Sequence, residues 1–318
     1  MKPYPVLLAP LMRPMPWGGD RLKKIAGTSR ADGPVGEAWV MSVRNGAVSR
    51  ILNGPLAGSD LSEYLEYFPD ARGAACADEV FPLLIKIIDA ADKLSVQVHP
   101  DDAYAAKNEK EPGKTEMWYI IDAEPGSVIT AGLSHGVKVE QLASGEPDEA
   151  FFRKIYPAPG DVVFVPPGLV HSIGAGILLC EIQQNSDLTY RIFDFDRKWG
   201  GVPRPLHLQK AADCVVNYSN DDIEALRFSR SDRSDPSELC SCDKFRVERF
   251  RTTDDTPAVF RVKNDRFSAL TVVSSDANAE LESENTIVPL SFGSCVFLPA
   301  GTGDVRVRGN AVFLISEI

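Results

Sequence analysis

The sequence predicts a mainly β protein that contains two related β-barrels and a few short helices. Short apolar segments recur along the chain, and Gly, Pro, Asn and Asp separate them at short spacing, as in all-β sandwiches and barrels. One segment near the middle of the chain is repeated near its C-terminal end. The length of 318 residues is sufficient for two domains of about 100–200 residues each. The clearest expected strands are residues 83–89, 93–99, 116–122, 161–167 and 177–184.

The repeat joins residues 160–176, GDVVFVPPGLVHSIGAG, to residues 293–309, GSCVFLPAGTGDVRVRG, without gaps. Both copies have the pattern strand, Pro-x-Gly turn, strand. Repeated units of this kind indicate a duplicated structure, although the general likeness of β-turns is an alternative explanation. His171 in the first copy corresponds to Asp304 in the second. We therefore expect two copies of one barrel, of which only the first retained its histidine.

Helices are expected where polar N-cap residues precede amphipathic segments. These segments are residues 61–68, 101–109, 146–155 and 207–216. Residues 217–236 are polar and lack periodicity, which is typical of a linker. We therefore expect a first domain at residues 1–220, which holds the candidate site and the short helices, and a second barrel at residues 221–318 without metal ligands.

The composition excludes several classes of protein. The formal net charge of −11 argues against a nucleic-acid binder, which would present a basic face. No apolar run approaches the roughly 20 residues that span a bilayer, and prolines interrupt the apolar N-terminal patch that a secretory signal would need. We expect a cytoplasmic protein with no membrane or nucleic-acid partner, and the sequence predicts no particular oligomeric state.

The cysteines form no CxxC pair, so we expect free thiols in a reducing compartment. Cys240 and Cys242 are close enough in sequence to bind a metal together, but two ordinary thiols in a loop or strand are the favoured interpretation.

The strand expected at residues 93–99 carries the first candidate site residues. Its side chains alternate between faces, so Ser95, Gln97 and His99 share the polar face and three apolar residues share the other. A polar face directed inward is what a barrel with a ligand-holding interior requires. A solvent-exposed strand would alternate in the same way, but it more often carries Lys, Glu or Thr.

Two further segments add potential metal ligands. Glu116 lies in GKTEMWYI on the same strand face as Lys114, and His171 follows a Pro-Pro-Gly turn. Two histidines, a carboxylate and the amide of Gln97 form a plausible first shell for a divalent ion. Zinc suits nitrogen and oxygen ligands of this kind, and iron, manganese and cobalt accept them as well. His135 and His207 are expected in a loop and at a helix start.

Several cations accompany this candidate metal site. They are Lys114, Arg191, Arg197 and Lys198. The planar guanidinium of arginine suits phosphate oxygens, and lysine supplies a mobile charge or a proton. The alternative for any one of them is a surface ion pair with Asp194 or Asp196, which we expect for at least one of Arg197 and Lys198.

At this point a family resemblance is clear. The chain resembles the short bacterial form of the type I phosphomannose isomerases. The matching segments are PMPWGGDRL (14–22), VGEAWVMS (35–42), FPLLIKIIDAADKLSVQVHPDD (81–102), GKTEMWYII (113–121), PPGLVHSIG (166–174) and EIQQNSDLTYRIFDFDR (181–197). They occur in the order of the family over the first 200 residues, and the C-terminal third matches only in general character.

The resemblance implies two barrels of the cupin, or jelly-roll, type and the interconversion of mannose 6-phosphate and fructose 6-phosphate through a cis-enediol. It implies that one zinc ion is bound by Gln97, His99, Glu116 and His171. It further implies that Arg191 is catalytic and that Lys114 lies beside the substrate. More weakly, it places Ser95 and either Arg197 or Lys198 near the phosphate. The small-molecule partner would be a sugar phosphate.

Some alternatives remain open from the sequence. The general base is Lys114, Glu181, Asp187 or a hydroxide at the metal. Another metal-dependent isomerase or epimerase, acting on a different sugar or sugar phosphate, would have a similar set of residues. A non-catalytic sugar-binding cupin is a further alternative, but such a protein would be expected to lose a metal ligand or the arginine, and all of them are present.

Overall fold

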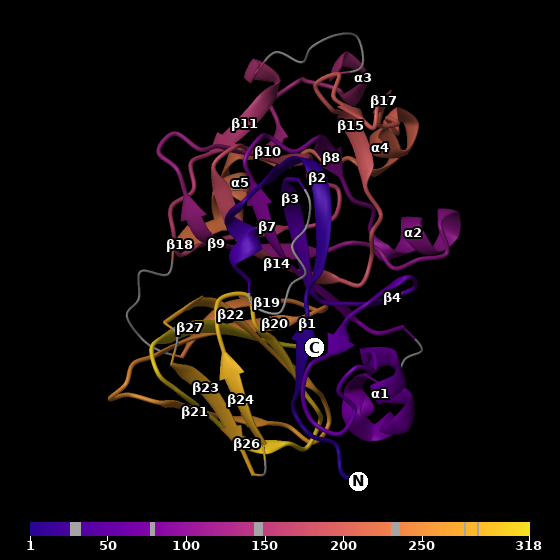
Figure 1. Cartoon of the computed structure of the whole chain (residues 1–318). Helices are drawn as coiled ribbons and strands as arrows, with labels where there is room; N and C mark the ends of the chain where they lie inside the picture. Colours follow the sequence, from indigo (N-terminus) through magenta and orange to yellow (C-terminus); the bar gives the residue numbers. More distant parts are fainter. Residues whose placement is uncertain (26–32, 77–79, 143–148, 230–235, 277, 285) are drawn as a thin grey trace.

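The computed structural model describes residues 1–25, 33–76, 80–142, 149–229, 236–276, 278–284 and 286–318, and it confirms the mainly β, cupin-type fold. Two β-sandwiches lie one above the other in Figure 1. In the first sandwich, the larger sheet has the order β18 (Arg227–Ser229), β12 (Asp161–Val165), β9 (Glu116–Ala123), β14 (Ile177–Gln184), β7 (Leu83–Ala90), β2 (Leu11–Gly19), β3 (Val35–Met41). The smaller sheet has the order β11 (Phe152–Ile155), β10 (Ile129–Leu133), β13 (His171–Ile173), β8 (Val96–Val98), β15 (Tyr190–Phe193).

The second sandwich contains mostly C-terminal strands. Its larger sheet has the order β19 (Ser237–Ser241), β20 (Arg246–Thr252), β27 (Ala311–Glu317), β22 (Ser268–Ser275), β25 (Cys295–Leu298), β1 (Val6–Ala9), β6 (Arg50–Ile51). Its smaller sheet has the order β21 (Ala258–Val262), β26 (Gly303–Arg308), β23 (Ala279–Ser283), β24 (Thr286–Leu290). Within it, Phe313 and Val296 of the larger sheet share a core with Leu281 and Val305 of the smaller sheet.

A separate apolar core joins the two sandwiches. The outward faces of the two larger sheets supply it: Met117 and Ile182 come from β9 and β14, and Phe297 and Leu314 come from β25 and β27. All four side chains are fully buried. The strands of the larger sheet in the first sandwich are therefore apolar on their outer face, and their inner face is free to carry polar groups.

The start of the chain contributes to the second sandwich. Strand β1 pairs antiparallel with β25, with Val6 opposite Phe297, and β6 pairs with β1. In Figure 1 the indigo β1 lies beside the yellow strands. At the other boundary, β18 adds to the first sandwich by pairing with β12. The division at residue 220 stays a prediction, and these pairings indicate that each sandwich is assembled from separated parts of the chain.

The two copies of the sequence repeat occupy equivalent places. In each copy the first strand, β12 or β25, lies in a larger sheet, and the second, β13 or β26, lies in a smaller sheet. The glycines at equivalent positions have matching positive φ angles, for example 82° at Gly168 and 75° at Gly301, a conformation that only glycine adopts without strain. His171 is buried on β13, whereas Asp304 on β26 is exposed and pairs with Arg261.

Three of the four expected helices are present: α1 (Leu61–Tyr67), α2 (Asp102–Asn108) and α4 (Leu208–Cys214). Asp60 and Glu63 form a capping box at the start of α1. The fourth expectation, a helix over residues 146–155, is wrong where the chain is described: a 3₁₀ turn over Glu149–Phe151 leads into strand β11, and residues 146–148 lie outside the described part. A short helix, α3 (Val139–Leu142), precedes this segment.

The expected linker at residues 217–236 is also ordered over much of its length. It contains α5 (Asn220–Leu226) and β18, while residues 230–235 lie outside the described part. Ser219 and Asp222 form a capping box that begins α5. The spacing of Ser219 and Asp222 is the sequence signal for such a helix start, but the polar composition of the segment obscured it.

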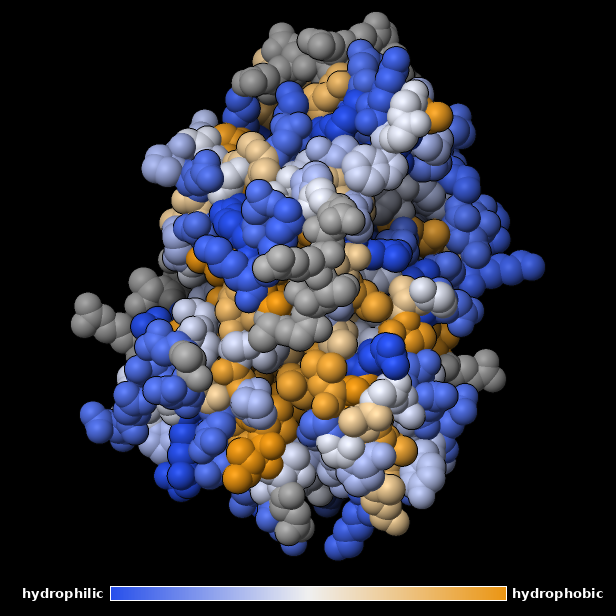
Figure 2. Space-filling model, in the orientation of Figure 1, coloured by the Kyte–Doolittle hydropathy of each residue, from blue (hydrophilic) through white to orange (hydrophobic). Residues whose placement is uncertain are grey.

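In the described part of the chain, no helix has the length and apolar character needed to cross a membrane. Figure 2 shows a largely hydrophilic surface on the upper half of the face in view, and apolar side chains gather lower on this face, over the second sandwich.

Candidate active site

Three buried side chains meet inside the first sandwich. His99 follows β8, Glu116 begins β9 and His171 begins β13, and one potential ligand atom from each lies within 4.8 Å of the others. Nε2 of His99 is 3.7 Å from Oε2 of Glu116, and Nε2 of His171 is 3.5 Å from Oε1 of Glu116. Within the described residues, these three form the one cluster of His, Cys, Asp and Glu side chains with this spacing.

The two histidines are oriented as metal ligands usually are. Nδ1 of His99 lies 2.7 Å from the carbonyl oxygen of Leu188, and Nδ1 of His171 lies 2.9 Å from that of Leu169. A carbonyl accepts only, so each Nδ1 carries the proton and each Nε2 presents a lone pair to the centre of the cluster. Nε2 of His99 and Oε1 of Glu116 are buried without a hydrogen-bond partner. Such buried acceptors are costly unless something binds them, so the donor set fits a divalent cation.

The protonation states agree with this assignment. Burial lowers the pKa of His171 to about 4 and lowers the pKa of His99 well below its usual value, and Lys114 adds to both effects. Both rings are therefore neutral near pH 7. Burial and the nearby Glu181 raise the pKa of Glu116, while Lys114, 3.1 Å away, opposes that shift. A cation at the cluster would favour the ionised carboxylate.

Gln97 and Ser95 lie where the strand alternation placed them. Nε2 of Gln97 is 3.4 Å from Nε2 of His171, and Oγ of Ser95 donates to Oε1 of Gln97 over 3.1 Å. Gln97 pairs across the sheet with His171 on one side and with Arg191 on the other. The smaller sheet therefore brings the amide, one histidine and the arginine together.

The larger sheet contributes a polar row across four strands. In register, Trp39 lies opposite Lys86, Lys86 opposite Glu181, and Glu181 opposite Trp118. Nζ of Lys86 is 2.9 Å from Oε1 of Glu181, and the indole of Trp118 donates to Oε2 of Glu181 over 3.0 Å. Burial alone would raise the pKa of Glu181, but the charges of Lys86 and Lys114, with the hydrogen bonds from Lys86 and Trp118, together outweigh burial and lower the pKa. Glu181 is thus an ionised carboxylate buried in the first sandwich.

The polar row borders a cavity of about 270 Å³, and of the four predicted metal ligands Gln97 lines it. Its lining includes Ser95, Gln97, Lys114, Glu181 and Arg191. Nη1 of Arg191 donates to the carbonyl oxygen of Pro205, while its Nε is buried without a partner and is available to a ligand. Burial, assisted by the nearby Arg204, lowers the pKa of Arg191.

The two cations predicted to bind the phosphate lie outside the cavity. Arg197 donates to the carbonyl oxygen of Lys93 and Lys198 is exposed on the β16–β17 hairpin (Lys198–Trp199, Val202–Pro203), so neither lines the cavity. Positive φ angles at Phe195 and Asp196, 56° and 50°, turn the chain at this point. The phosphate role of these two cations stays a prediction.

Other cations that the sequence reasoning did not select do line the cavity: Arg13, Lys86 and Arg204. Arg13 shares a face of β2 with Met15 and Trp17, an alternation visible in the sequence. Lys86 interrupts the apolar run LLIKIID, which is the sign of a buried charge. Arg204 is held by Asp194 through two bonds of 2.7 and 2.6 Å, and no local pattern indicates it.

His207 also lines the cavity, although we expected only a role at the start of a helix. It precedes α4, and its Nδ1 accepts the backbone N–H of Arg191 over 3.1 Å. Its own backbone N–H donates to the carbonyl oxygen of Arg191 over 2.8 Å. His135 is exposed in a turn, as expected. The two cysteines at 240 and 242 are free thiols.

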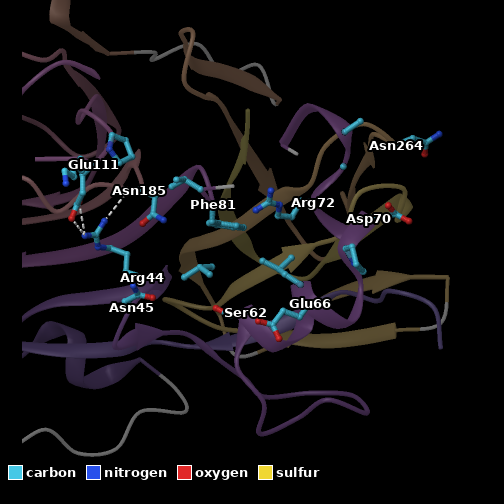
Figure 3. A pocket seen from close by; sticks show the side chains of 18 residues that line it. Arg44, Asn45, Ser62, Glu66, Asp70, Arg72, Phe81, Glu111, Asn185 and Asn264 are labelled. Carbon is cyan, nitrogen blue, oxygen red and sulfur yellow. Dashed lines mark hydrogen bonds and ion pairs between the residues drawn. The ribbon is translucent and has the colours of Figure 1, made fainter. Parts of the chain in front are cut away.

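A larger groove, about 1100 Å³, is lined by none of the four predicted metal ligands (Figure 3). Its lining mixes charges of both signs, including Arg44 and Arg72 with Glu66, Asp70 and Glu111. The groove is therefore separate from the candidate metal site.

Comparison with known proteins agrees with this geometry. Residues 6–128 match the model of the type I phosphomannose isomerase catalytic domain. The chain is 34% identical to mannose-6-phosphate isomerase ManA of Bacillus subtilis over the full length of both proteins. It is 42% identical to mannose-6-phosphate isomerase of Streptococcus mutans over 67% of this chain and 68% of that protein. The crystal structure of mannose 6-phosphate isomerase from Bacillus subtilis superposes with a TM-score of 0.84 at 31% identity, covering 99% of each chain. The chain belongs to the type I phosphomannose isomerase family.

Proposed function

We propose that the protein is a cytoplasmic, zinc-dependent isomerase that interconverts mannose 6-phosphate and fructose 6-phosphate through a cis-enediol. The observation that carries this proposal is the convergence of His99, Glu116 and His171 beside a cavity that Gln97, Lys114 and Arg191 line. Full-length relatives that are mannose-6-phosphate isomerases support the choice of substrate.

The metal would be held by His99, Glu116 and His171, with the amide of Gln97 as the fourth ligand. Two neutral imidazoles and oxygen donors suit zinc. When bound, zinc supplies Lewis-acid polarisation of the carbonyl and hydroxyl oxygens of the sugar, which is worth several kcal/mol.

The side chains of the protein supply the remaining chemistry. Isomerisation removes the proton at C2 of the open-chain aldose and returns a proton to C1. Lys114, Glu181 and Asp187 line the cavity and are the side-chain candidates to carry this proton. Nε of Arg191 stabilises negative charge as it develops on the enediol oxygens. Trp39 and Trp118 of the polar row line the same cavity and give part of its wall an apolar surface.

The phosphate of the substrate would lie at the cationic side of the cavity. Arg13 and Arg204 line it together with Ser95. Arg13 is fixed over the ring of Trp39 at 4.4 Å, and Arg204 is fixed by Asp194. Guanidinium groups that are oriented in advance bind phosphate oxygens with little loss of side-chain entropy.

A coupled assay tests the reaction directly. Purified protein is incubated with mannose 6-phosphate, and fructose 6-phosphate is followed through coupling enzymes, before chelation, after chelation and after zinc is added back. We expect turnover that chelation abolishes and zinc restores. The absence of turnover in zinc-loaded protein would contradict the proposal, and free mannose and other sugar phosphates would then be assayed.

Substitution of Arg191 by alanine separates catalysis from metal binding. Loss of one preorganised donor to developing charge typically costs about 100-fold or more in kcat. We therefore expect kcat to fall by about that factor while the zinc content, measured by atomic absorption, stays near one per chain. Unchanged turnover would remove Arg191 from the mechanism.

A further inference from the structure

The segment Gly113–Thr115, just before β9, is held by three consecutive backbone amides. The N–H of Gly113 donates to Oδ1 of Asp102 over 2.8 Å. The N–H of Lys114 donates to the carbonyl oxygen of Pro100 over 3.0 Å, and the N–H of Thr115 donates to Oε1 of Gln184 over 2.9 Å. Because Glu116 is the next residue, these bonds fix Lys114 and Glu116 against the turn that follows His99.

Asp102 connects this segment to two other parts of the molecule. It is the first residue of α2, and its Oδ1 also accepts from Nε2 of Gln184 over 3.0 Å. Its Oδ2 is 2.8 Å from Nζ of Lys244, which lies in the turn between β19 and β20 of the second sandwich. Burial alone would raise the pKa of Asp102, but these donors outweigh it and lower the pKa, so the side chain is ionised.

Gly113 packs tightly against the backbone at the start of α2. A Cβ atom at Gly113 would lie 2.5 Å from the backbone of Asp101 and Asp102. On the opposite side, Arg44 donates to the carbonyl oxygen of Asn185 over 2.9 Å and pairs with Glu111 at 3.1 Å, as the dashed lines in Figure 3 show. The chain from Glu111 to Thr115 is therefore fastened at both ends.

We propose that Asp102 is a positioning residue for the metal site and that Lys244 of the second sandwich holds it in place. The proposal assigns a role to the second sandwich, whose described residues contribute nothing to the His99–Glu116–His171 cluster, and it builds on the proposed zinc-dependent reaction. Asp102 acts through Gly113: it sets where Lys114 and Glu116 lie relative to His99 and His171. Groups that orient metal ligands typically change metal affinity or activity by about 10- to 100-fold when they are removed.

Zinc affinity, measured by competition with a chromophoric chelator, is the first readout, and kcat and KM for mannose 6-phosphate are the second. We expect Asp102→Ala to weaken zinc binding by about 10- to 100-fold and to lower kcat in the zinc-saturated enzyme more than it changes KM. Asp102→Asn keeps an oxygen acceptor for Gly113 and should recover most of both losses. Asp101→Ala is the matched control, because Asp101 caps α2 but does not contact Gly113 through its side chain.

Lys244 is tested by Lys244→Met, with Arg246→Met as its control. Arg246 lies in the same hairpin and pairs with Glu238 and Glu248, away from Asp102. A partly exposed ion pair contributes little on its own, so we expect a two- to about fivefold weakening of zinc binding for Lys244→Met, recovery in Lys244→Arg, and none for the control. Circular dichroism and urea unfolding establish that each variant is folded.

Wild-type zinc affinity and kcat in both Asp102→Ala and Lys244→Met would overturn the inference. An effect in Asp101→Ala equal to that in Asp102→Ala would also overturn it, since the loss would then come from helix α2. If the wild-type protein shows no zinc-dependent turnover of mannose 6-phosphate, the proposed function fails. The zinc affinities of the variants still decide the positioning role in that case.

Discussion

Replacing His171 by alanine is expected to remove the bound metal and to reduce turnover of mannose 6-phosphate by at least about 1000-fold. His171 is 1% exposed, and its Nε2 points at Glu116. Without it, the metal would keep one imidazole and two oxygen donors. The reaction would then lose Lewis-acid assistance worth several kcal/mol, and each 1.4 kcal/mol is about a factor of ten in rate. Atomic absorption and the coupled assay measure the two losses together.

His135→Ala is the matched control for this substitution. His135 is exposed in a turn, so the same change of residue type should leave metal content and activity unaltered. Circular dichroism would establish that His171→Ala still folds. A folded His171→Ala protein with one zinc per chain and normal turnover would show that the metal is bound elsewhere.

The second large effect concerns stability. Glu181→Gln is expected to lower the free energy of unfolding by about 3–5 kcal/mol, because it leaves the ammonium of Lys86 buried without its partner. Both side chains are 4% exposed and their charged atoms are 2.9 Å apart. Glutamine retains the acceptor for Trp118, so the loss measures the ion pair rather than the hydrogen bond. Urea unfolding at neutral pH gives the change.

A double substitution distinguishes this explanation from simple loss of packing. Lys86→Met combined with Glu181→Met removes both charges and should recover most of the lost stability, since apolar replacements of buried pairs are often neutral. It should not recover activity, because both residues line the cavity. Asp304→Asn, which breaks an exposed pair with Arg261, should change stability by less than about 1 kcal/mol. Equal losses of unfolding free energy in Glu181→Gln, the double variant and Asp304→Asn would contradict a stabilising role of the buried Lys86–Glu181 pair.

The strand pattern carried most of the site prediction. The alternation in residues 93–99 placed Ser95, Gln97 and His99 on one face, and the structure finds Ser95 and Gln97 in the cavity wall with His99 at the cluster. The expected strand at residues 177–184 is β14, residue for residue. The strand expected at residues 93–99 is shorter in the structure, β8 (Val96–Val98), so Ser95 and His99 flank it, and the roles of the site residues stay predictions. The placement could be read from the sequence because the two-residue period of a strand is a local property, set by backbone geometry.

The predictions that failed depend on contacts between distant segments. Residues 152–155 form β11 rather than a helix because they pair with β10, where Ile155 lies opposite Ile129. The expected linker supplies β18 because β12 offers an open edge. Pairing of this kind overrides local preference, and a single sequence does not reveal which edge is available.

The sequence by itself determined the mainly β fold, the duplication and the types of ligand at the candidate metal site. Each of these depends on patterns among residues that are close in sequence: the alternation along strands, the glycines at turns, and the histidines next to those turns. Only the tertiary structure decided that β1 completes the second sandwich, that Arg13 and Arg204 line the cavity while Arg197 and Lys198 do not, and that Lys244 reaches Asp102. Those outcomes follow from which surfaces pack together, because packing is a property of the whole chain and is not encoded in any one segment.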